Sequence, residues 1–196
     1  MTPAETHILD AAKVCTERWG IARVSVDDIS AEAGVSRATL YRMFPGGKDV
    51  VFDALRVREL EEFFITLQHG VADSTDLEDL LVRTVVVATT GLRNDKHLAI
   101  MLALEPGDTL AQLTVQGLPR IIRMASLFLA PLVEPYLRRV DAARLVELLS
   151  RLVISYFLAP SDHVDLGDPD SARAFIQSHV LPAFHTHSQP TTGVQR

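Results

Sequence analysis

The stretch from Val24 to Phe44, VSVDDISAEAGVSRATLYRMF, restricts the fold more than any other part of the chain. Ser25 followed three residues later by Asp28 is a capping pattern that satisfies free backbone amides where a helix begins. Gly34 can adopt the positive φ angle that ends a helix and permits a tight turn, and Ser36 can cap the next helix. The stretch therefore predicts two short helices joined by a sharp turn.

The second of these helices is predicted to have a buried side and an exposed side. Leu40, Met43 and Phe44 recur at a spacing of three to four residues, which places them on the inward side. At about 100° per residue, the exposed side and its flanks carry guanidinium, hydroxyl and methyl groups. These residues are Arg37, Ala38, Thr39, Tyr41 and Arg42. Such a face suits the DNA major groove, because arginine donates bidentately to guanine and small methyl groups contact the thymine methyl.

Helical periodicity extends along the rest of the chain, and no segment alternates with period two between hairpin turns. We therefore predict an all-α fold of about nine helices. Two short helices are expected within 24–44, and one interrupted helical segment is expected to end at 129. Single helices are expected at about 4–19, 48–69, 77–92, 96–104, 141–158 and 169–185.

The composition is that of a folded chain, with 47% hydrophobic and 22% charged residues. The net charge of −6 argues against nucleic-acid binding, but the distribution of charge weakens this objection. No acidic residue occurs between Ala33 and Lys48, whereas Arg37, Arg42 and Lys48 add three positive charges there. A local basic patch matters more for docking on DNA than the total charge.

Two further expectations concern location and the single cysteine. No apolar run reaches the roughly 18 residues of a spanning helix, and the N-terminus lacks the pattern of a secretion signal, so a cytoplasmic protein without a membrane partner is predicted. Cys15 falls on an apolar helical stripe with Ile8, Ala12 and Trp19, and is predicted to be a core residue.

No pattern of an enzyme is found along the chain. The sequence has no glycine-rich phosphate loop, no histidine–glutamate zinc pattern and no serine elbow, and its seven histidines have no coherent ligand spacing. We therefore expect no catalytic residue, no metal and no cofactor. A DNA-binding regulator is favoured, and a helical dimer that binds a protein partner and keeps the two short helices only as scaffold remains the alternative.

Three segments in fixed order carry a resemblance to a known family. ILDAAKVCTERWG, SVDDISAEAGVSRATLYRMF and PGGKDVVFDAL, within about Ile8 to Leu55, resemble the DNA-binding domain of the tetracycline-repressor (TetR) family. The resemblance covers about a quarter of the chain and implies contacts of a homodimer with double-stranded DNA. Together with the exposed helix face, the expected DNA-binding residues are Ser25, Ser36, Arg37, Ala38, Thr39, Tyr41, Arg42 and Lys48. Met43 departs from the aromatic or histidine frequent at that place, so no contact is transferred to it.

The resemblance also implies a division of the chain by function. Residues 1–47 would form the helix-turn-helix domain, 48–187 a helical regulatory and dimerisation domain, and 188–196 a disordered tail. Polar-tipped and apolar residues on the middle helices are candidates for contact with a small apolar or amphipathic ligand: Met101, Glu105, Gln116, Arg120, Met124, Phe128 and Tyr156. The last two long helices are expected to pair across a dimer axis through Leu145, Leu149, Leu152, Val153, Phe175, Ile176, Val180 and Phe184.

Overall fold

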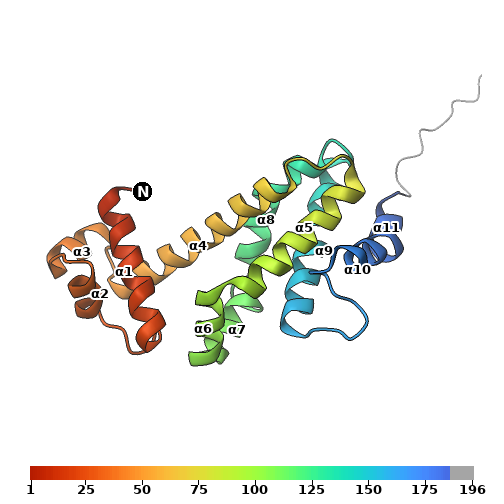
Figure 1. The fold of residues 1–196 in the computed structure, drawn as a ribbon. Helices are drawn as coiled ribbons and strands as arrows, with labels where there is room; N and C mark the ends of the chain where they lie inside the picture. The colour runs from red at the N-terminus through yellow and green to blue at the C-terminus, as the bar shows by residue number, and fades with distance from the viewer. Residues whose placement is uncertain (186–196) are drawn as a thin grey trace, which may run out of the picture. The chain divides into compact units, whose positions relative to one another are not determined.

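The computed structural model describes residues 1–185, and every regular element within that range is a helix (Figure 1). The predicted all-α fold is confirmed. The helices are α1 (Pro3–Trp19), α2 (Val26–Glu32), α3 (Arg37–Met43), α4 (Lys48–Val71), α5 (Leu77–Asn94), α6 (Lys96–Leu104), α7 (Pro106–Leu113), α8 (Leu118–Val133), α9 (Arg139–Leu158), α10 (Pro169–Phe175) and α11 (Leu181–His185). The expected tail, 188–196, lies outside the described residues.

The chain divides into two compact units, and the division does not follow the order of the sequence. The first unit contains Met1–Phe63 and Asn94–Pro119, and the second contains Phe64–Arg93 and the chain from Arg120 onward. The first unit therefore combines α1, α2 and α3 with the beginning of α4 and with α6 and α7. These units are defined by contacts, whereas the predicted boundary after residue 47 divides the chain by function. That boundary stays a prediction.

The core of the first unit is built by apolar stripes of its short helices. Ile8, Leu9 and Ala12 of α1 are fully buried, and Ile29 of α2 and Leu40 of α3 meet them in the same cluster. The cluster is completed by Ala11, Cys15, Val24, Ala33, Phe44, Val51, Phe52 and Leu55. Each helix contributes residues three or four positions apart, which is the spacing that keeps one helical face on the core.

Cys15 is buried in this core, as the sequence predicts. Burial raises the pKa of its thiol, and the nearby carboxylates of Glu32 and Asp28 act in the same direction. Trp19, expected on the same stripe, is instead 44% exposed. It is the last residue of α1, where the chain turns away at Gly20, so the stripe ends before it.

Side chains cap the helix starts at the positions that the sequence indicates. Ser25 and Asp28 form the predicted reciprocal capping box of α2, and the Ser36 hydroxyl accepts from the backbone N–H of Thr39 at the start of α3. Asp168 caps α10. Each cap satisfies an amide that has no partner within its own helix, and so fixes where the helix begins.

The second unit has its own core between α5, α9 and the C-terminal helices. Leu81 and Val85 of α5, Leu145 of α9 and Ile176 are among its buried residues. The last predicted helix, 169–185, is not uniform, because a π-helical turn at Ile176–Val180 separates α10 from α11. Within residues 1–185 no helix combines the length and the apolar composition needed to cross a bilayer.

Candidate DNA-binding interface

The turn between α2 and α3 depends on one glycine and one half-buried valine. Gly34 has φ +62°, in the left-handed region that glycine adopts without strain. The N–H of Val35 then donates to the carbonyl of Ser30 at 3.0 Å, and the Val35 side chain packs on the core. The chain is thus reversed within three residues, and Ser36 begins α3 on the other side of the turn.

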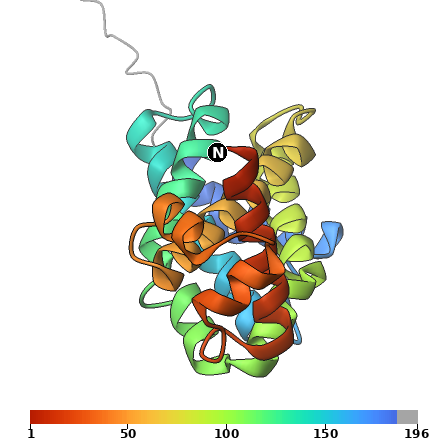
Figure 2. The same cartoon turned by 90° about the vertical axis from the view of Figure 1, so that its left-hand side faces the viewer.

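One side of α3 is buried and the other is exposed. Leu40 is 0% exposed, and Met43 packs on the core cluster from a half-buried position. Of the five α3 residues predicted to face DNA, four are exposed, namely Arg37, Ala38, Tyr41 and Arg42, while Thr39 is half-buried. Figure 2 turns α1, α2 and α3 toward the viewer. The exposed face carries two guanidinium groups on a helix whose position is fixed by its buried side.

The polar atoms of this face differ in what they contact. The hydroxyls of Ser36 and Thr39 lie 2.9 Å apart, so they hold one another at the start of α3. Arg37 donates from Nη1 to Oδ2 of Asp27 at 3.2 Å. Arg42 makes no hydrogen bond or ion pair with any residue of the described part of the chain. The face therefore presents one paired and one unpaired arginine.

Lys48, one of the residues predicted to bind DNA, lies at the beginning of α4 and is half-buried. Its Nζ donates to the carbonyl of Val24 at 3.0 Å and to that of Ile21 at 3.4 Å. These bonds tie α4 to the loop that precedes α2. An ammonium has three donors, so one remains available for an oxygen of another molecule.

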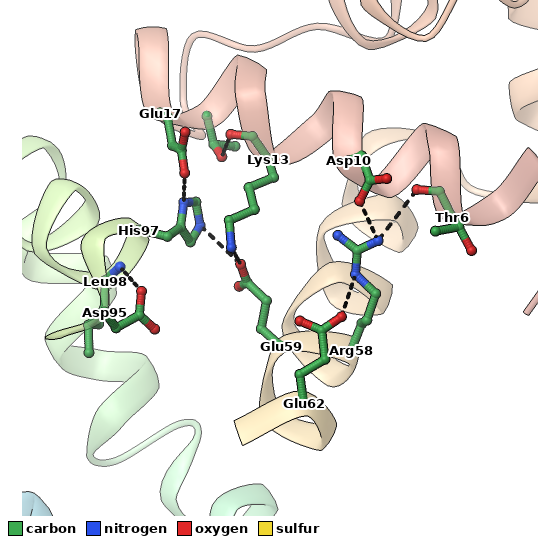
Figure 3. A network of polar contacts seen from close by, with 11 residues as sticks. Thr6, Asp10, Lys13, Glu17, Arg58, Glu59, Glu62, Asp95, His97 and Leu98 are labelled. Atoms are coloured by element: carbon green, nitrogen blue, oxygen red, sulfur yellow. Dashed lines mark hydrogen bonds and ion pairs between the residues drawn. The ribbon is translucent and has the colours of Figure 1, made fainter. Parts of the chain in front are cut away.

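A polar cluster joins α1, α4 and α6 within the first unit (Figure 3). Nζ of Lys13 lies 2.9 Å from Oε1 of Glu59, and the ring of His97 lies between Glu17, at 3.3 Å from Nδ1, and Glu59, at 3.7 Å from Nε2. Burial opposes the charge of Lys13, but Glu59, Asp95 and Glu17 outweigh it and raise the pKa of Lys13. We call these residues the α1–α4–α6 cluster.

Arg58 extends this contact between α1 and α4. Its Nη1 donates to Oδ1 of Asp10 at 2.8 Å and lies 3.4 Å from the carbonyl of Thr6, while its Nε lies 3.7 Å from Oε1 of Glu62 (Figure 3). The side chain of Arg58 is only 12% exposed. The sequence gives no local signal for these contacts, because Arg58 and Asp10 are 48 residues apart.

The residues predicted to bind a ligand belong to both units. Met101, Glu105 and Gln116 lie in the first unit. Met101 is buried and Gln116 is exposed, while Glu105 accepts a hydrogen bond from the backbone N–H of Ala22 at 2.8 Å. The contact of Glu105 with the loop before α2 could not be predicted from sequence, because the two residues are 83 positions apart.

The remaining predicted ligand residues lie in the second unit on α8 and α9, where two of them take part in aromatic pairs. Phe128 stacks on Phe64 with ring centroids 5.9 Å apart, and Tyr156 meets Phe175 edge-on at 5.6 Å. Arg120 and Met124 are half-buried on α8, as are Phe128 and Tyr156 on their helices. All four are thus partly covered by the chain itself.

Burial divides the residues predicted for the dimer interface into two groups. Five of the eight are buried by the chain's own residues: Leu145, Leu149, Val153, Ile176 and Val180. Leu152, Phe175 and Phe184 are half-buried. A side chain that is already buried within the monomer has little surface left to contact a second copy. Direct contacts with a second copy are therefore expected from the three half-buried residues and from the exposed residues beside them.

Comparison with known proteins agrees with this geometry. Residues 8–55, which include most of α1 and all of α2 and α3, match the family described as bacterial regulatory proteins, tetR family. The chain thus carries a DNA-binding domain of the tetR family. It is a DNA-binding transcriptional regulator of the helix-turn-helix type.

Relatives that match nearly the whole chain occur in mycobacteria. Over 186 residues it is 27% identical to uncharacterized HTH-type transcriptional regulators of Mycobacterium bovis and Mycobacterium tuberculosis. The matched region covers 91% of this chain and 92% of each of those proteins. The likeness thus extends well beyond the helix-turn-helix into the rest of the chain.

Solved structures show the same fold over nearly the whole length. The TetR-family repressor AlkX from a Dietzia strain, implicated in biodegradation of n-alkanes, superposes with a TM-score of 0.66 at 20% identity, over 94% of this chain and 96% of that one. The fatty acid degradation regulator FadR from Bacillus halodurans gives a TM-score of 0.59 at 20% identity, over 92% and 98%. At these identities the comparison establishes the TetR fold.

Proposed function

We propose that this TetR-family regulator is a repressor that binds a near-palindromic operator as a homodimer and is released from DNA by a small molecule. The observation that carries the proposal is the exposed face of α3, with Arg37 and Arg42 on a helix anchored by the fully buried Leu40. A helix of this kind can enter the major groove, where arginine distinguishes guanine by two hydrogen bonds.

The other DNA-facing residues would hold the duplex by its backbone. Ser25, Ser36 and Tyr41 carry hydroxyls on exposed residues, and Lys48 keeps one ammonium donor beyond its two bonds to backbone carbonyls. Ala38 and Thr39 bring methyl groups next to the arginines. Contacts to phosphate set the register of the protein on DNA, whereas contacts to base edges select the sequence.

A homodimer would place two copies of α3 in successive major grooves, so that the separation of the half-sites follows the separation of the two heads. We propose that α9 and α10 form the dimer interface. Leu152 and Phe175 are half-buried there and retain apolar surface, and the exposed Ala143 and Ala174 would let two helices approach closely. In this proposal the direct contacts across the interface are made by half-buried and exposed residues, and the five buried residues predicted from the sequence support them from within the monomer.

The ligand is proposed to be small and largely apolar. AlkX and FadR, which share the fold, are named for n-alkane biodegradation and fatty acid degradation. In the second unit of this chain, Met124, Phe128 and Tyr156 offer apolar bodies, and Arg120 offers a positive charge, on helices that flank its core. A mostly apolar site with a few polar groups is typical of small-molecule pockets.

Release from DNA would require that ligand binding changes the orientation of the helix-turn-helix. We propose that the α1–α4–α6 cluster takes part in this step, because Lys13 and Glu17 on the DNA-binding head contact Glu59 on α4 and His97 on α6. A ligand that favours one arrangement of these helices shifts the population toward it.

The proposal is tested by DNA binding at two salt concentrations. Purified protein is titrated against duplexes selected from a random-sequence library and against a scrambled duplex, followed by footprinting. We expect saturable binding that weakens steeply as salt rises, because several phosphates are neutralised, and a footprint of two symmetric halves. No duplex binding at low salt would contradict the proposal and favour the protein-binding alternative.

A further inference from the structure

Asp27 and Arg37 form an ion pair between α2 and α3 on the exposed side of the helix-turn-helix. Nη1 of Arg37 donates to Oδ2 of Asp27 at 3.2 Å, and Nε lies 3.1 Å from Oδ1. We propose that Asp27 is a positioning residue, which holds the Arg37 guanidinium for base contact and so sets the sequence specificity of the regulator. This inference rests on the proposed role of Arg37 as a base reader.

The start of α2 explains Asp28 but not the orientation of Asp27. Asp28 closes the capping box with Ser25. Its carboxylate accepts hydrogen bonds from the hydroxyl and from the backbone N–H of Ser25. The carboxylate of Asp27 accepts from no backbone amide in the described part of the chain, and Arg37 is the residue it pairs with. An acid in the first turn also favours the helix dipole, but that effect does not depend on Arg37.

The pair leaves Arg37 able to contact a base. A guanidinium has five N–H donors, and the hydrogen bond to Asp27 engages one of them. Both hydrogens of Nη2 and the second hydrogen of Nη1 remain. Guanine requires two donors for its O6 and N7 acceptors. Arg37 can therefore keep its bond to Asp27 and still offer guanine a bidentate contact.

Without Asp27, the guanidinium of Arg37 would have no described group to orient it. The side chains of Arg37 and Asp27 are 61% and 62% exposed, so packing does not hold the long arginine in one rotamer. An exposed pair of this kind contributes little to folding stability, typically about 0 to 1 kcal/mol. Its effect is expected in the complex with DNA, because a fixed guanidinium loses less conformational freedom when it contacts guanine.

Asp27 also places a negative charge on a face that meets phosphates. A carboxylate there repels any duplex regardless of sequence, and its pair with Arg37 reduces the positive charge offered to random DNA. Asp27 should therefore weaken binding to random duplexes while supporting binding to the duplex in which Arg37 contacts guanine. The repulsion weakens both affinities alike and cancels in their ratio, so the orientation of Arg37 is what raises this ratio, which measures specificity.

The test is a double-mutant cycle on that ratio. Asp27→Ala, Arg37→Ala and the double variant are titrated against a duplex selected from a random library by the wild-type protein and against its scrambled counterpart. We expect Asp27→Ala to lower the ratio about tenfold in the wild-type background and to leave it unchanged in the Arg37→Ala background. Binding to the scrambled duplex should become tighter in Asp27→Ala.

Glu32→Ala is the matched control. Glu32 lies on the same helix, α2, and its carboxylate is paired with an exposed arginine, but that partner is Arg18 of α1 at 3.0 Å. The variant removes the same charge and a comparable ion pair without touching α3. Its ratio should stay near that of the wild type. A drop equal to that of Asp27→Ala would assign the effect to net charge and overturn the positioning role.

The remaining outcomes separate the inference from the function on which it rests. If Arg37→Ala lowers the ratio and Asp27→Ala does not, Arg37 reads DNA without help and the inference is wrong. If Asp27→Ala lowers the ratio equally in both backgrounds, Asp27 contacts a base by itself, which also overturns the proposal. If Arg37→Ala binds DNA with an unchanged ratio, the base-reading role of Arg37 and the inference both fail.

Discussion

Glu105, at the junction of α6 and α7, accepts a hydrogen bond from the backbone N–H of Ala22, which lies 83 residues earlier in the chain, at 2.8 Å. Ala22 belongs to the loop that leads into α2. Gly20, in the same loop, approaches so closely that a Cβ atom there would lie 2.7 Å from Oε1 of Glu105. The loop before the helix-turn-helix is thus held by a carboxylate that is distant in the sequence, at the junction of α6 and α7.

Substitution of Glu105 should show how much this bond stabilises the fold. Glu105→Ala removes a charged acceptor and should lower the free energy of unfolding by about 1.5 to 3 kcal/mol. Glu105→Gln keeps an acceptor oxygen for the N–H of Ala22, so its cost should be smaller. Urea unfolding measures both. The exposed Glu61→Ala is the control, and an equal effect of Glu61→Ala and Glu105→Ala would contradict the role of the bond.

Two glycines with positive φ should respond differently to alanine. Gly34 has φ +62°, and a Cβ atom added there would meet no other atom within 4 Å, so Gly34→Ala meets only backbone strain of about 1 to 2 kcal/mol. Gly20 has φ +78° and also the contact with Glu105, so Gly20→Ala should cost more. Unfolding in urea compares the two. In the Glu105→Ala background the difference should shrink, and an unchanged difference would mean that the close approach does not contribute.

The ion pair between Lys13 and Glu59 should couple α1 to α4 measurably. Both side chains are partly buried, at 35% and 25% exposure, so we expect a coupling of about 0.5 to 1 kcal/mol in a double-mutant cycle of Lys13→Met and Glu59→Gln. The pair Arg56 and Asp53 lies within a single helix and serves for comparison. A coupling near zero would show that the contact drawn in Figure 3 adds nothing to the junction.

The capping box of α2 should make part of the stability depend on pH in the acid range. Hydrogen bonds from the hydroxyl and the backbone of Ser25 lower the pKa of Asp28 below its ordinary 3.8. Because the pKa of Asp28 is lower in the folded state than in the unfolded state, the ionised carboxylate stabilises the fold at pH values above the unfolded-state pKa. This stabilisation is lost as the pH falls through the folded-state pKa.

Asp28→Ala should therefore destabilise the protein at neutral pH, and the gap to the wild type should narrow at pH of about 3. Urea unfolding at the two pH values provides the measurement. Asp162→Ala is the control, because Asp162 makes no hydrogen bond or ion pair with a described residue. A gap that stays constant with pH would show that the ionised carboxylate of Asp28 is not what caps the helix.

The sequence was sufficient where the physical cause is local. The caps at Ser25 and Ser36, the turn at Gly34 and the buried side of α3 at Leu40 depend on residues within a few positions of each other. These features fixed the fold class and the exposed face of α3. Helix periodicity also placed α6 at its observed bounds, 96–104.

The contacts that sequence reasoning missed depend on the tertiary arrangement. The pairing of Glu105 with Ala22, and of His97 with Glu17, joins residues about 80 positions apart, and no periodicity encodes such a meeting. The buried state of Leu145 and Ile176 was equally invisible, because an apolar stripe that faces the chain's own core looks the same as one that faces a second copy. Asp27 has no distinguishing signal in the sequence, because acids are common in the first turn of a helix and α2 has two there.

Lys48 connects the scaffold to the proposed phosphate contacts, and its substitution should affect both. Lys48→Ala removes the bonds to the carbonyls of Val24 and Ile21 and should cost about 1 kcal/mol in the free energy of unfolding. If the ammonium also neutralises a phosphate, binding to selected and scrambled duplexes should weaken by a similar factor, and the slope of affinity against salt should fall by about 1.

The exposed Lys96→Ala is the control for Lys48→Ala, since it removes the same charge from the first unit at a lysine that makes no polar contact in the described part of the chain. Its salt slope should stay at the wild-type value. A loss for Lys48→Ala that is confined to the selected duplex, with an unchanged salt slope, would mean that Lys48 acts by placing α2 and α3 through its two carbonyl bonds rather than by contacting phosphate.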